Sequence, residues 1–347
     1  MPEKIKVALA THAGGAHLGA YFSALAATDE VDSVALVDPS GQSNAAAKKA
    51  LGDKLVATYD DVGKMLKAFQ PVLTVVTMEA ATAPPVIARI LEGGSHVFAE
   101  KPSCVNAKDF QRLTALADGK HLNLMLALAN RLNPEVQRAR RLIEDGDIGK
   151  VYGVDMHLIA DQTRLTRPAY HKTWFAKKDR SGGGHLIWLG IHWLDLAVHL
   201  TGAKVKQVAG FTANVGGQPI DIEDSAAASL QFDNGTLGTL TSGYYLDRGY
   251  HSHIKIWGST GWLHLEQMKD KPLRWYSTRG KNKGQIQEFD GSKQPRGYTP
   301  FVQAAVRACA GMQEPPISNA DSLHAIETVY AIYDAANKGH VQSVSMG

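Results

Sequence analysis

The chain has 347 residues, 44% hydrophobic and 20% charged, with a formal net charge of +3. This length suffices for two domains with separate cores, and so small a charge argues against a nucleic-acid-binding protein. Two cysteines rule out a disulfide framework, no apolar run is long enough to span a bilayer, and the N-terminus lacks a signal-peptide pattern. We therefore expect a soluble cytoplasmic protein that binds neither nucleic acid nor membrane.

The first third of the chain alternates apolar, strand-like runs with helical patterns. This alternation predicts a doubly wound parallel sheet, and strands that are apolar throughout fit burial on both faces. We assign residues 1–128 to this α/β domain. The expected strands are 4–10, 31–37, 72–77, 96–99 and 122–128, and the expected helices are 14–27, 44–51, 84–92 and 107–117.

The pattern changes after Asn133-Pro134. Strand-like segments separated by glycine-rich turns then dominate, which predicts an antiparallel or mixed sheet in an α+β domain over 129–347. The final helix is free to pack back near the first domain. The expected strands are 151–160, 205–213, 225–232, 237–245, 251–257 and 261–265, and the expected helices are 135–144, 188–200, 300–309 and 321–337.

A glycine-rich turn follows the first strand. Residues 14–19 read GGAHLG, a dinucleotide fingerprint in which Ala16 replaces the middle glycine. Asp38 ends the second strand, where a carboxylate accepts hydrogen bonds from the ribose of NAD and repels the 2′-phosphate of NADP. The alternatives are a chance glycine-rich turn and a turn residue before Pro39. We predict NAD rather than NADP, bound by Thr11, His12, Gly14, Gly15, Ala16, Asp38, Glu100 and Lys101.

Two further segments carry side chains suited to hydride-transfer chemistry. Lys101 follows the strand 96–99, and open α/β sheets bind ligands at the carboxyl ends of their strands. His192 and Asp195 stand at i, i+3 after a triple glycine, on one face of a helix. A lysine and a histidine that meet beside a nicotinamide can take a proton from an alcohol while its hydride leaves. The alternatives are a salt-bridging surface lysine and a core histidine.

Two other patterns bear on ligands. His185, His192 and His199 recur every seven residues, but two helical turns, about 10 Å, separate neighbours in such a series, so no metal site is expected. The loop before the glycines is rich in aromatic and polar groups, which suits carbohydrate recognition, although a surface excursion is the alternative. The substrate-binding candidates in this loop are Arg164, Tyr170, His171 and Trp174.

Together these motifs resemble the Gfo/Idh/MocA oxidoreductases, NAD(P)-dependent enzymes that act mostly on sugars and cyclitols. The resemblance implies a Rossmann domain followed by a large open, mostly antiparallel sheet, often used to assemble dimers or tetramers. It also implies that Lys101 lies beside the nicotinamide and the reacting hydroxyl. The similar segments are the glycine loop, 100–102, 130–134, 182–195, 222–225, 258–261 and the final helix.

The chain departs from this family's pattern at one position. The family's glycine-rich segment reads GGGxLxDxGxH, with the Asp and the His facing substrate. Here His192 matches the histidine, but Trp188 stands in place of the Asp. A tryptophan accepts no proton, although its ring can lie on a sugar face and its N–H can donate to a hydroxyl; the alternative is a core residue. Asp195 either contacts substrate or orients His192 within a polar network.

Three functions are compatible with these residues. The first is an NAD-dependent oxidoreductase, a homodimer or homotetramer, that moves a hydride between a sugar, polyol or glycoside carbon and nicotinamide, with Lys101 and His192 handling the proton. The second, suggested by the missing Asp, is an enzyme that epimerises or cleaves a glycoside through a transient keto intermediate and recycles its NAD. The third is a non-catalytic sensor of NAD or sugar.

Overall fold

The computed structural model describes residues 4–246, 248–267, 269–291 and 293–345. The chain forms two compact units. The first comprises Met1–Ala129, Asp179–Gly182 and Arg296–Leu323, and the second comprises Asn130–Lys178, Gly183–Pro295 and His324–Gly347. The chain therefore leaves the first unit one residue beyond the expected domain boundary and returns to it twice. No helix within the described ranges combines the length and the apolar character needed to cross a membrane.

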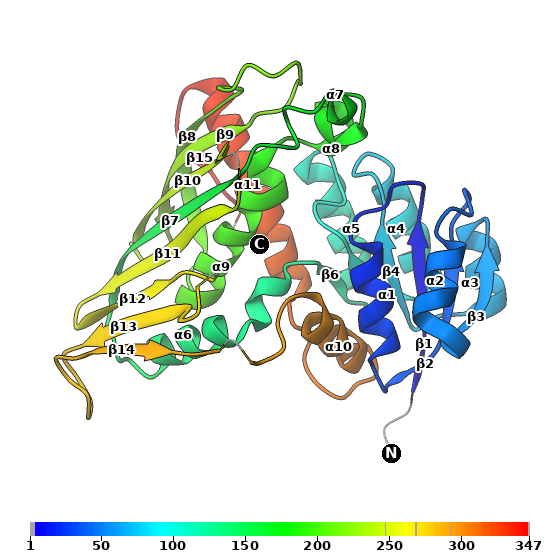
Figure 1. The fold of residues 1–347 in the computed structure, drawn as a ribbon, viewed down its shortest axis with the longest axis horizontal. Helices are drawn as coiled ribbons and strands as arrows, with labels where there is room; N and C mark the ends of the chain where they lie inside the picture. Colours follow the sequence, from blue (N-terminus) through cyan, green and yellow to red (C-terminus); the bar gives the residue numbers. More distant parts are fainter. Residues whose placement is uncertain (1–3, 247, 268, 292, 346–347) are drawn as a thin grey trace. The chain divides into compact units, whose positions relative to one another are not determined.

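The first unit is a doubly wound sheet of six parallel strands in the order β3-β2-β1-β4-β5-β6 (Figure 1). The strand order reverses between β1 and β4, and ligands bind beyond the carboxyl ends of strands at such a point. This confirms the predicted fold class of the N-terminal region. Its elements are β1 (Ile5–Thr11), α1 (Leu18–Ala26), β2 (Val31–Val37), α2 (Asn44–Leu51), β3 (Leu55–Tyr59), α3 (Val62–Phe69), β4 (Leu73–Thr77), α4 (Ala83–Glu92), β5 (His96–Ala99), α5 (Ala107–Gly119), β6 (Leu124–Leu126) and α10 (Tyr298–Cys309).

Two local features of this unit differ from the sequence prediction. The sequence analysis predicted neither strand β3 nor helix α3. Strand β3 was missed because it is a short edge strand in which half-buried and exposed residues alternate. The helix expected from Gly14 begins only at Leu18. Gly14 and His17 have φ angles of 80° and 58°, in the left-handed region, which a right-handed helix cannot include.

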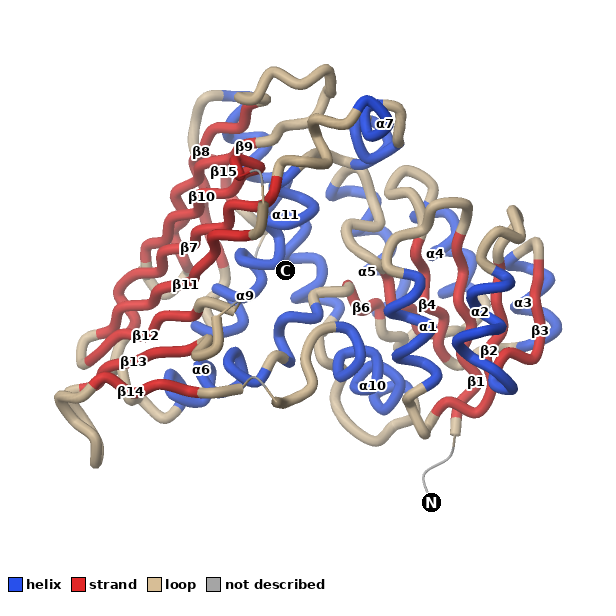
Figure 2. Tube along the Cα trace, in the orientation of Figure 1, coloured by secondary structure: helices blue, strands red, loops and turns tan. Residues whose placement is uncertain are grey.

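The second unit is built on a sheet of nine strands in the order β14-β13-β12-β11-β7-β10-β9-β8-β15 (Figure 2). Among the described strand pairs of this sheet, β7–β10 alone is parallel, so the predicted α+β domain with a mostly antiparallel sheet is confirmed. Its strands are β7 (Val151–Asp161), β8 (Val205–Ala213), β9 (Ser225–Phe232), β10 (Leu237–Leu246), β11 (Tyr250–Gly258), β12 (Gly261–Leu265), β13 (Leu273–Ser277), β14 (Ile286–Phe289) and β15 (Gln342–Ser343).

Helices cover one face of this sheet. Helix α9 packs on β7 and α6 packs on β12, and the indole of Trp193 in α9 donates to the carbonyl of His253 at 2.9 Å. Alternate residues of β7, such as Met156 and Leu158, are buried against the helices. The remaining helical elements are α6 (Pro134–Glu144), α7 (Pro168–His171), α8 (Lys178–Ser181), a π-helical turn (Leu186–Gly190), α9 (Ile191–Thr201), α11 (Asn319–Lys338) and short 3-10 turns at Gly52–Lys54, Ala129–Leu132 and Trp174–Ala176.

Candidate active site

The glycine loop lies between the ends of β1 and β4. A Cβ atom on Gly15 would overlap Thr11 Oγ1 and would lie 2.9 Å from the carbonyl oxygen of Thr77, so only glycine fits there. Thr77 Oγ1 also donates to the carbonyl of Ala16 at 2.6 Å, which fixes the loop to β4. A Cβ on Gly19 would meet nothing within 4 Å, so this third glycine is not required for close helix–strand packing. The close backbone approach therefore occurs at Gly15.

Two cavities flank this loop, and His12 lines both. One, of about 560 Å³, has apolar walls that include Val37, Pro39 and Val86. The other, of about 380 Å³, is lined by Gly14, Asp38 and Ser43 among others. Helix α1, all of whose residues are described, has no acidic side chain in its first turn that would repel a phosphate. An apolar recess beside a glycine loop at a helix N-terminus fits the adenine and pyrophosphate of a dinucleotide.

Asp38 is engaged by its own loop. One carboxylate oxygen accepts from the backbone N and the hydroxyl of Ser40, at 3.0 and 2.7 Å. The other accepts from the backbone N of Ser43 at 2.9 Å and from the Ser43 hydroxyl. Burial opposes ionisation of Asp38, but the Ser43 and Ser40 donors outweigh it and lower the pKa of the carboxyl. These contacts are those of the turn-residue alternative, and a ribose contact stays a prediction.

An ion pair that the sequence did not suggest lies beside the larger cavity. Glu79, which lines that cavity, accepts two hydrogen bonds from the guanidinium of Arg180. The backbone N–H of Glu79 donates to His12 Nε2 at 2.5 Å, and the N–H of Ala81 donates to the carbonyl of Arg180 at 3.1 Å. The segment just before the triple glycine is thus bound to the glycine loop through Glu79. Nothing in the spacing of these residues signals the pairing, because it joins positions 101 apart.

Lys101 lies just beyond β5 and is 4% exposed, which excludes the surface-lysine alternative. Its Nζ lies 3.9 Å from Glu100 Oε1. The other oxygen of Glu100 accepts from the hydroxyl of Tyr21, and the hydroxyl of Tyr298 lies 3.5 Å from it. Neither tyrosine was a sequence candidate. The predicted pair Glu100–Lys101 is therefore a buried ion pair with two phenols on its far side.

Trp188 and Trp174 meet in an aromatic cluster with Phe175. The rings of Trp174 and Phe175 stack with centroids 3.8 Å apart, and Trp188 lies edge-on to both, at 5.4 and 5.0 Å. Both tryptophans are 8% exposed. Two of the predicted substrate residues are thus brought together, while the burial of Trp188 agrees with the core alternative. His192, in the first turn of α9, is half-buried.

Glu223 holds the triple-glycine segment. Its side chain accepts from the backbone N–H groups of Gly184 and Leu186 at 2.7 and 3.0 Å, and from the hydroxyl of Tyr333 at 2.8 Å. A Cβ on Gly184 would overlap the carbonyl of Glu223, and a Cβ on Gly183 would overlap the phenol of Tyr333. Burial raises the pKa of Glu223 despite these donors. The glycines are therefore required by a close approach, and the motif 222–225 was the only sequence signal for it.

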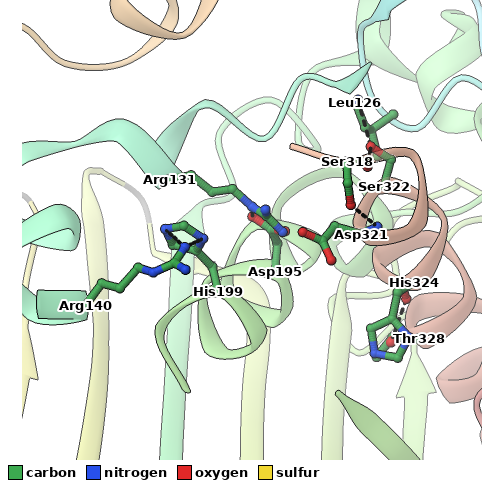
Figure 3. Close-up of polar contacts among 10 residues, drawn as sticks. All are labelled: Leu126, Arg131, Arg140, Asp195, His199, Ser318, Asp321, Ser322, His324 and Thr328. Atoms are coloured by element: carbon green, nitrogen blue, oxygen red, sulfur yellow. Dashed lines mark hydrogen bonds and ion pairs between the residues drawn. The ribbon is translucent and has the colours of Figure 1, made fainter. Parts of the chain in front are cut away.

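The carboxylate of Asp195 accepts hydrogen bonds from an arginine (Figure 3). It is 2% exposed, and Nε of Arg131 lies 3.0 Å from both of its carboxylate oxygens. One turn further along α9, His199 shares a hydrogen bond of 2.9 Å with Arg140. Burial, followed by the charges of Arg131 and Arg140, lowers the pKa of His199 to about 3. These contacts favour the network role of Asp195, and substrate contact by it stays a prediction.

The loop 164–174 packs on β10. The guanidinium of Arg164 lies 5.5 Å from the ring centroid of Tyr244, and Tyr170 packs against the same buried cluster. Burial raises the pKa of Tyr170 to about 12, so its hydroxyl remains a donor. His171 Nε2 bonds the carbonyl of Leu165 at 2.6 Å. This loop is therefore anchored at Tyr170 and His171, while Arg164 stays exposed.

Comparison with known proteins gives two family models. A model described as the oxidoreductase family, NAD-binding Rossmann fold, matches residues 12–128, and the GFO/IDH/MocA C-terminal domain matches residues 136–264. The myo-inositol 2-dehydrogenase of Thermotoga maritima is 22% identical over 240 residues, 68% of this chain and 69% of that protein.

Two further similarities concern an uncharacterized protein and a solved structure. An uncharacterized oxidoreductase of Schizosaccharomyces pombe is 27% identical over 49% of this chain, and the match spans only 45% of that protein's length. The crystal structure of an oxidoreductase domain protein from Kribbella flavida superposes with a TM-score of 0.88 at 22% identity, covering 99% of this chain and 100% of the other. This last likeness concerns the fold.

Proposed function

Because the chain belongs to the Gfo/Idh/MocA family of NAD-binding oxidoreductases, we propose that it is an NAD-dependent dehydrogenase of sugars, polyols or glycosides. The observation that carries the proposal is Lys101, a buried cation at the carboxyl end of β5 in the sheet that bears the glycine loop. A buried lysine at this edge of a doubly wound sheet is a candidate for acid–base chemistry.

The cofactor would occupy the two cavities beside the glycine loop. Its pyrophosphate would lie on the backbone of Gly14, Gly15 and Ala16, near Thr11 and His12, and its ribose on the loop that Asp38 organises. When bound, NAD supplies a hydride acceptor. Because the Asp38 carboxylate is kept ionised by Ser40 and Ser43, a 2′-phosphate beside it would be repelled, which favours NAD over NADP.

Lys101 and His192 would handle the proton. In oxidation the substrate carbon gives up a hydride, and its hydroxyl proton passes to the neutral amine of Lys101, which becomes an ammonium. His192 would orient the hydroxyl or share its proton. Most of the rate enhancement would come from holding the carbinol carbon in place rather than from the proton transfer itself.

The aromatic cluster would form part of the sugar site. Trp188 and Trp174 would offer ring faces to the apolar side of a sugar, and their indole N–H groups would donate to its hydroxyls. Arg164 and His171, with Tyr170 as a buried donor, would supply further polar contacts. Asp195 would act chiefly through Arg131.

One observation favours a second candidate function. Trp188, which replaces the family's Asp, is packed against Trp174 and Phe175 and accepts no proton. This departure from the family's pattern would accompany a changed reaction, a transient oxidation in which epimerisation or elimination next to a keto group is followed by return of the hydride. Such an enzyme would show no net accumulation of reduced cofactor.

We also propose a homodimer or homotetramer. The face of the nine-stranded sheet opposite its helices carries exposed Phe211, Leu237 and Trp257, with exposed fractions of 79, 62 and 40%. A second copy would cover such apolar side chains. Light scattering on the purified protein measures the mass directly.

The test of the proposed function is a substrate screen by absorbance at the wavelength of reduced nicotinamide. Myo-inositol, free hexoses, methyl glucosides and their keto derivatives should be offered with NAD or NADH. A dehydrogenase accumulates the product nicotinamide, whereas a recycling enzyme converts substrate with the absorbance unchanged. Failure of every compound to turn over, together with measurable NAD binding, would support the sensor instead.

A further inference from the structure

A buried carboxylate separates Lys101 from two tyrosines that come from distant parts of the chain. Glu100 follows β5, Tyr21 lies in α1, and Tyr298 is the first residue of α10. Glu100 and Lys101 are 3% and 4% exposed, and Tyr21 is fully buried. All four residues belong to the first unit, so their mutual geometry is that of one compact body.

The two oxygens of Glu100 have different surroundings. Oε2 accepts from the Tyr21 hydroxyl and faces the Tyr298 hydroxyl at 3.5 Å. Oε1 has no hydrogen-bond partner among the described residues and faces Lys101 Nζ at 3.9 Å. The carboxylate is thus held from behind by phenols, while its other oxygen is directed at the lysine.

The phenols act as donors in this arrangement. Burial, followed by the charge of Glu100, raises the pKa of Tyr21 well above its usual value, and the same causes raise the pKa of Tyr298. Both hydroxyls therefore keep their protons at neutral pH and above the pH at which a free tyrosine ionises. Hydrogen bonds donated to a carboxylate favour its ionised form.

We propose that Tyr21, Tyr298 and Glu100 are positioning residues that hold Lys101 in place as an ammonium ion. This rests on the proposed function, and it adds Tyr21 and Tyr298, to which neither the comparisons nor the motifs give a role. The physical reason is that an opposite charge about 4 Å away favours the charged lysine, whereas burial alone would favour the neutral amine.

An ammonium at rest sets a direction for the reaction. In carbonyl reduction, the carbonyl carbon would receive a hydride from bound NADH while the ammonium of Lys101 would give a proton to the oxygen, leaving an alcohol, NAD and a neutral amine that regains its proton from solvent. In oxidation, Lys101 must first lose a proton. At neutral pH the site is therefore prepared for reduction, and oxidation should become faster as the pH rises.

Other aromatic and charged groups lie near Tyr21 and Tyr298. His17 is exposed, and its ring lies 5.0 Å from that of Tyr298, while Phe98 lies against Tyr21. Helix α10 has a second attachment at its far end, where Arg307 donates to Glu30 at 2.7 Å. Glu30 is also a buried carboxylate, in the turn between α1 and β2, so it provides a matched control for loosening of α10.

The test follows the ionisation of Lys101 in the whole apoprotein and needs no substrate. Lysine labelled with carbon-13 at Cε gives one resonance per residue, and the Lys101 signal is assigned by its loss in Lys101→Arg. The pH midpoint of this signal is measured in the wild type, Glu100→Gln, Tyr21→Phe, Tyr298→Phe and Glu30→Gln. We expect the midpoint to fall by about 1 to 3 pH units in Glu100→Gln.

The tyrosine variants should cause smaller falls, larger for Tyr21→Phe than for Tyr298→Phe, because the Tyr298 contact is longer. Glu30→Gln should lower the melting temperature but leave the midpoint unchanged. A midpoint in Glu100→Gln equal to that of the wild type overturns the proposal. So does an equal shift in Glu30→Gln, which would show that only the docking of α10 matters. If Glu100→Gln does not fold, Tyr21→Phe and Tyr298→Phe take its place, and midpoints equal to that of the wild type overturn the proposal.

Once a substrate is known, the pH dependence of the oxidation rate gives a second readout. The acidic limb of this pH profile should move to lower pH in Glu100→Gln, while KM stays close to that of the wild type. If wild-type protein turns over substrate and Lys101→Arg does so equally well, the proposed proton role of Lys101 fails. If Lys101 is required but its midpoint ignores Glu100, only the positioning role fails.

Discussion

Each unit of the molecule contains a buried glutamate that accepts a hydrogen bond from a tyrosine. The two glutamates differ in the other groups that face their carboxylate oxygens. Glu223 receives two backbone N–H groups and the Tyr333 hydroxyl, so its oxygens are occupied by structural donors. Glu100 receives only phenols on one oxygen, and its other oxygen faces a cation. A carboxylate whose two oxygens both accept from backbone N–H groups holds a segment in shape. One that keeps an acceptor directed at a lysine can influence chemistry.

The largest expected effect is on activity, and it comes from a substitution in the first unit, beside Glu100. Lys101→Met should lower kcat by about 10²- to 10⁴-fold, the usual contribution of a general acid or base. NAD affinity, measured by fluorescence titration, should change far less, because the glycine loop and its cavities remain. Activity retained in Lys101→Met would remove the chemical role from the first unit and leave both glutamates structural.

Glu223→Ala should act on stability instead. It leaves buried amide donors at Gly184 and Leu186 without an acceptor, at a cost of about 1–3 kcal/mol for each unpaired group. Urea unfolding measures the loss. Glu30→Gln is the comparison variant, because Glu30 is likewise a buried carboxylate but accepts from an arginine and from no backbone N–H of the glycine segment. Equal losses in the two variants would contradict the special role of Glu223.

Acid should weaken the second unit through its buried histidines. Burial lowers the pKa of His185 to about 3, and burial with the nearby arginines does the same for His199. The unfolded chain binds these protons near pH 6.5 and the folded one does not, so stability present above pH 6.5 is lost as the pH falls towards 3. Each histidine contributes up to about 1.4 kcal/mol per pH unit in that range.

Denaturant midpoints measured between pH 7 and pH 4 check this sign. His199→Gln should flatten the decline. An unchanged slope in that variant would show that His199 is not responsible.

The smallest effect is expected at Asp38. Asp38→Asn removes the charge and one of the two acceptor oxygens, so NAD affinity should fall by less than about tenfold, and the preference for NAD over NADP should shrink. Ser43→Ala is the matched variant, since it removes one of the donors to Asp38 and no charge. An unchanged NADP affinity in Asp38→Asn would show that the carboxylate serves only its turn. Isothermal titration with both cofactors decides this.

The secondary structure followed closely from local pattern. Buried parallel strands such as β1 and β4 were visible as continuous apolar runs, because both faces of such a strand are covered. The edge strand β3 was not visible, since its exposed alternate residues leave no apolar run. The start of α1 was misplaced, because a left-handed backbone at His17 depends on the loop rather than on helix propensity.

The residues of the candidate site likewise fall into those that the sequence predicted and those that it did not. Lys101 could be inferred from sequence, because its place after a strand carries that information. The need for glycine at Gly15 could not, because the fingerprint places the close backbone approach at Ala16. The partners of these residues could not. Tyr298 reaches Glu100 across 198 positions, and Arg180 reaches Glu79 across 101. No periodicity or spacing encodes contacts of that separation.

The sequence by itself thus determined most of the strands and helices, the parallel sheet with its glycine loop, and the candidate lysine after β5, since these depend on neighbours along the chain. Only the tertiary structure decided which acceptors are already occupied. Asp38 is taken up by two serines and Asp195 by Arg131, whereas Glu100 keeps an oxygen for Lys101. That distinction depends on hydrogen bonds between distant segments, which form only when the chain has packed.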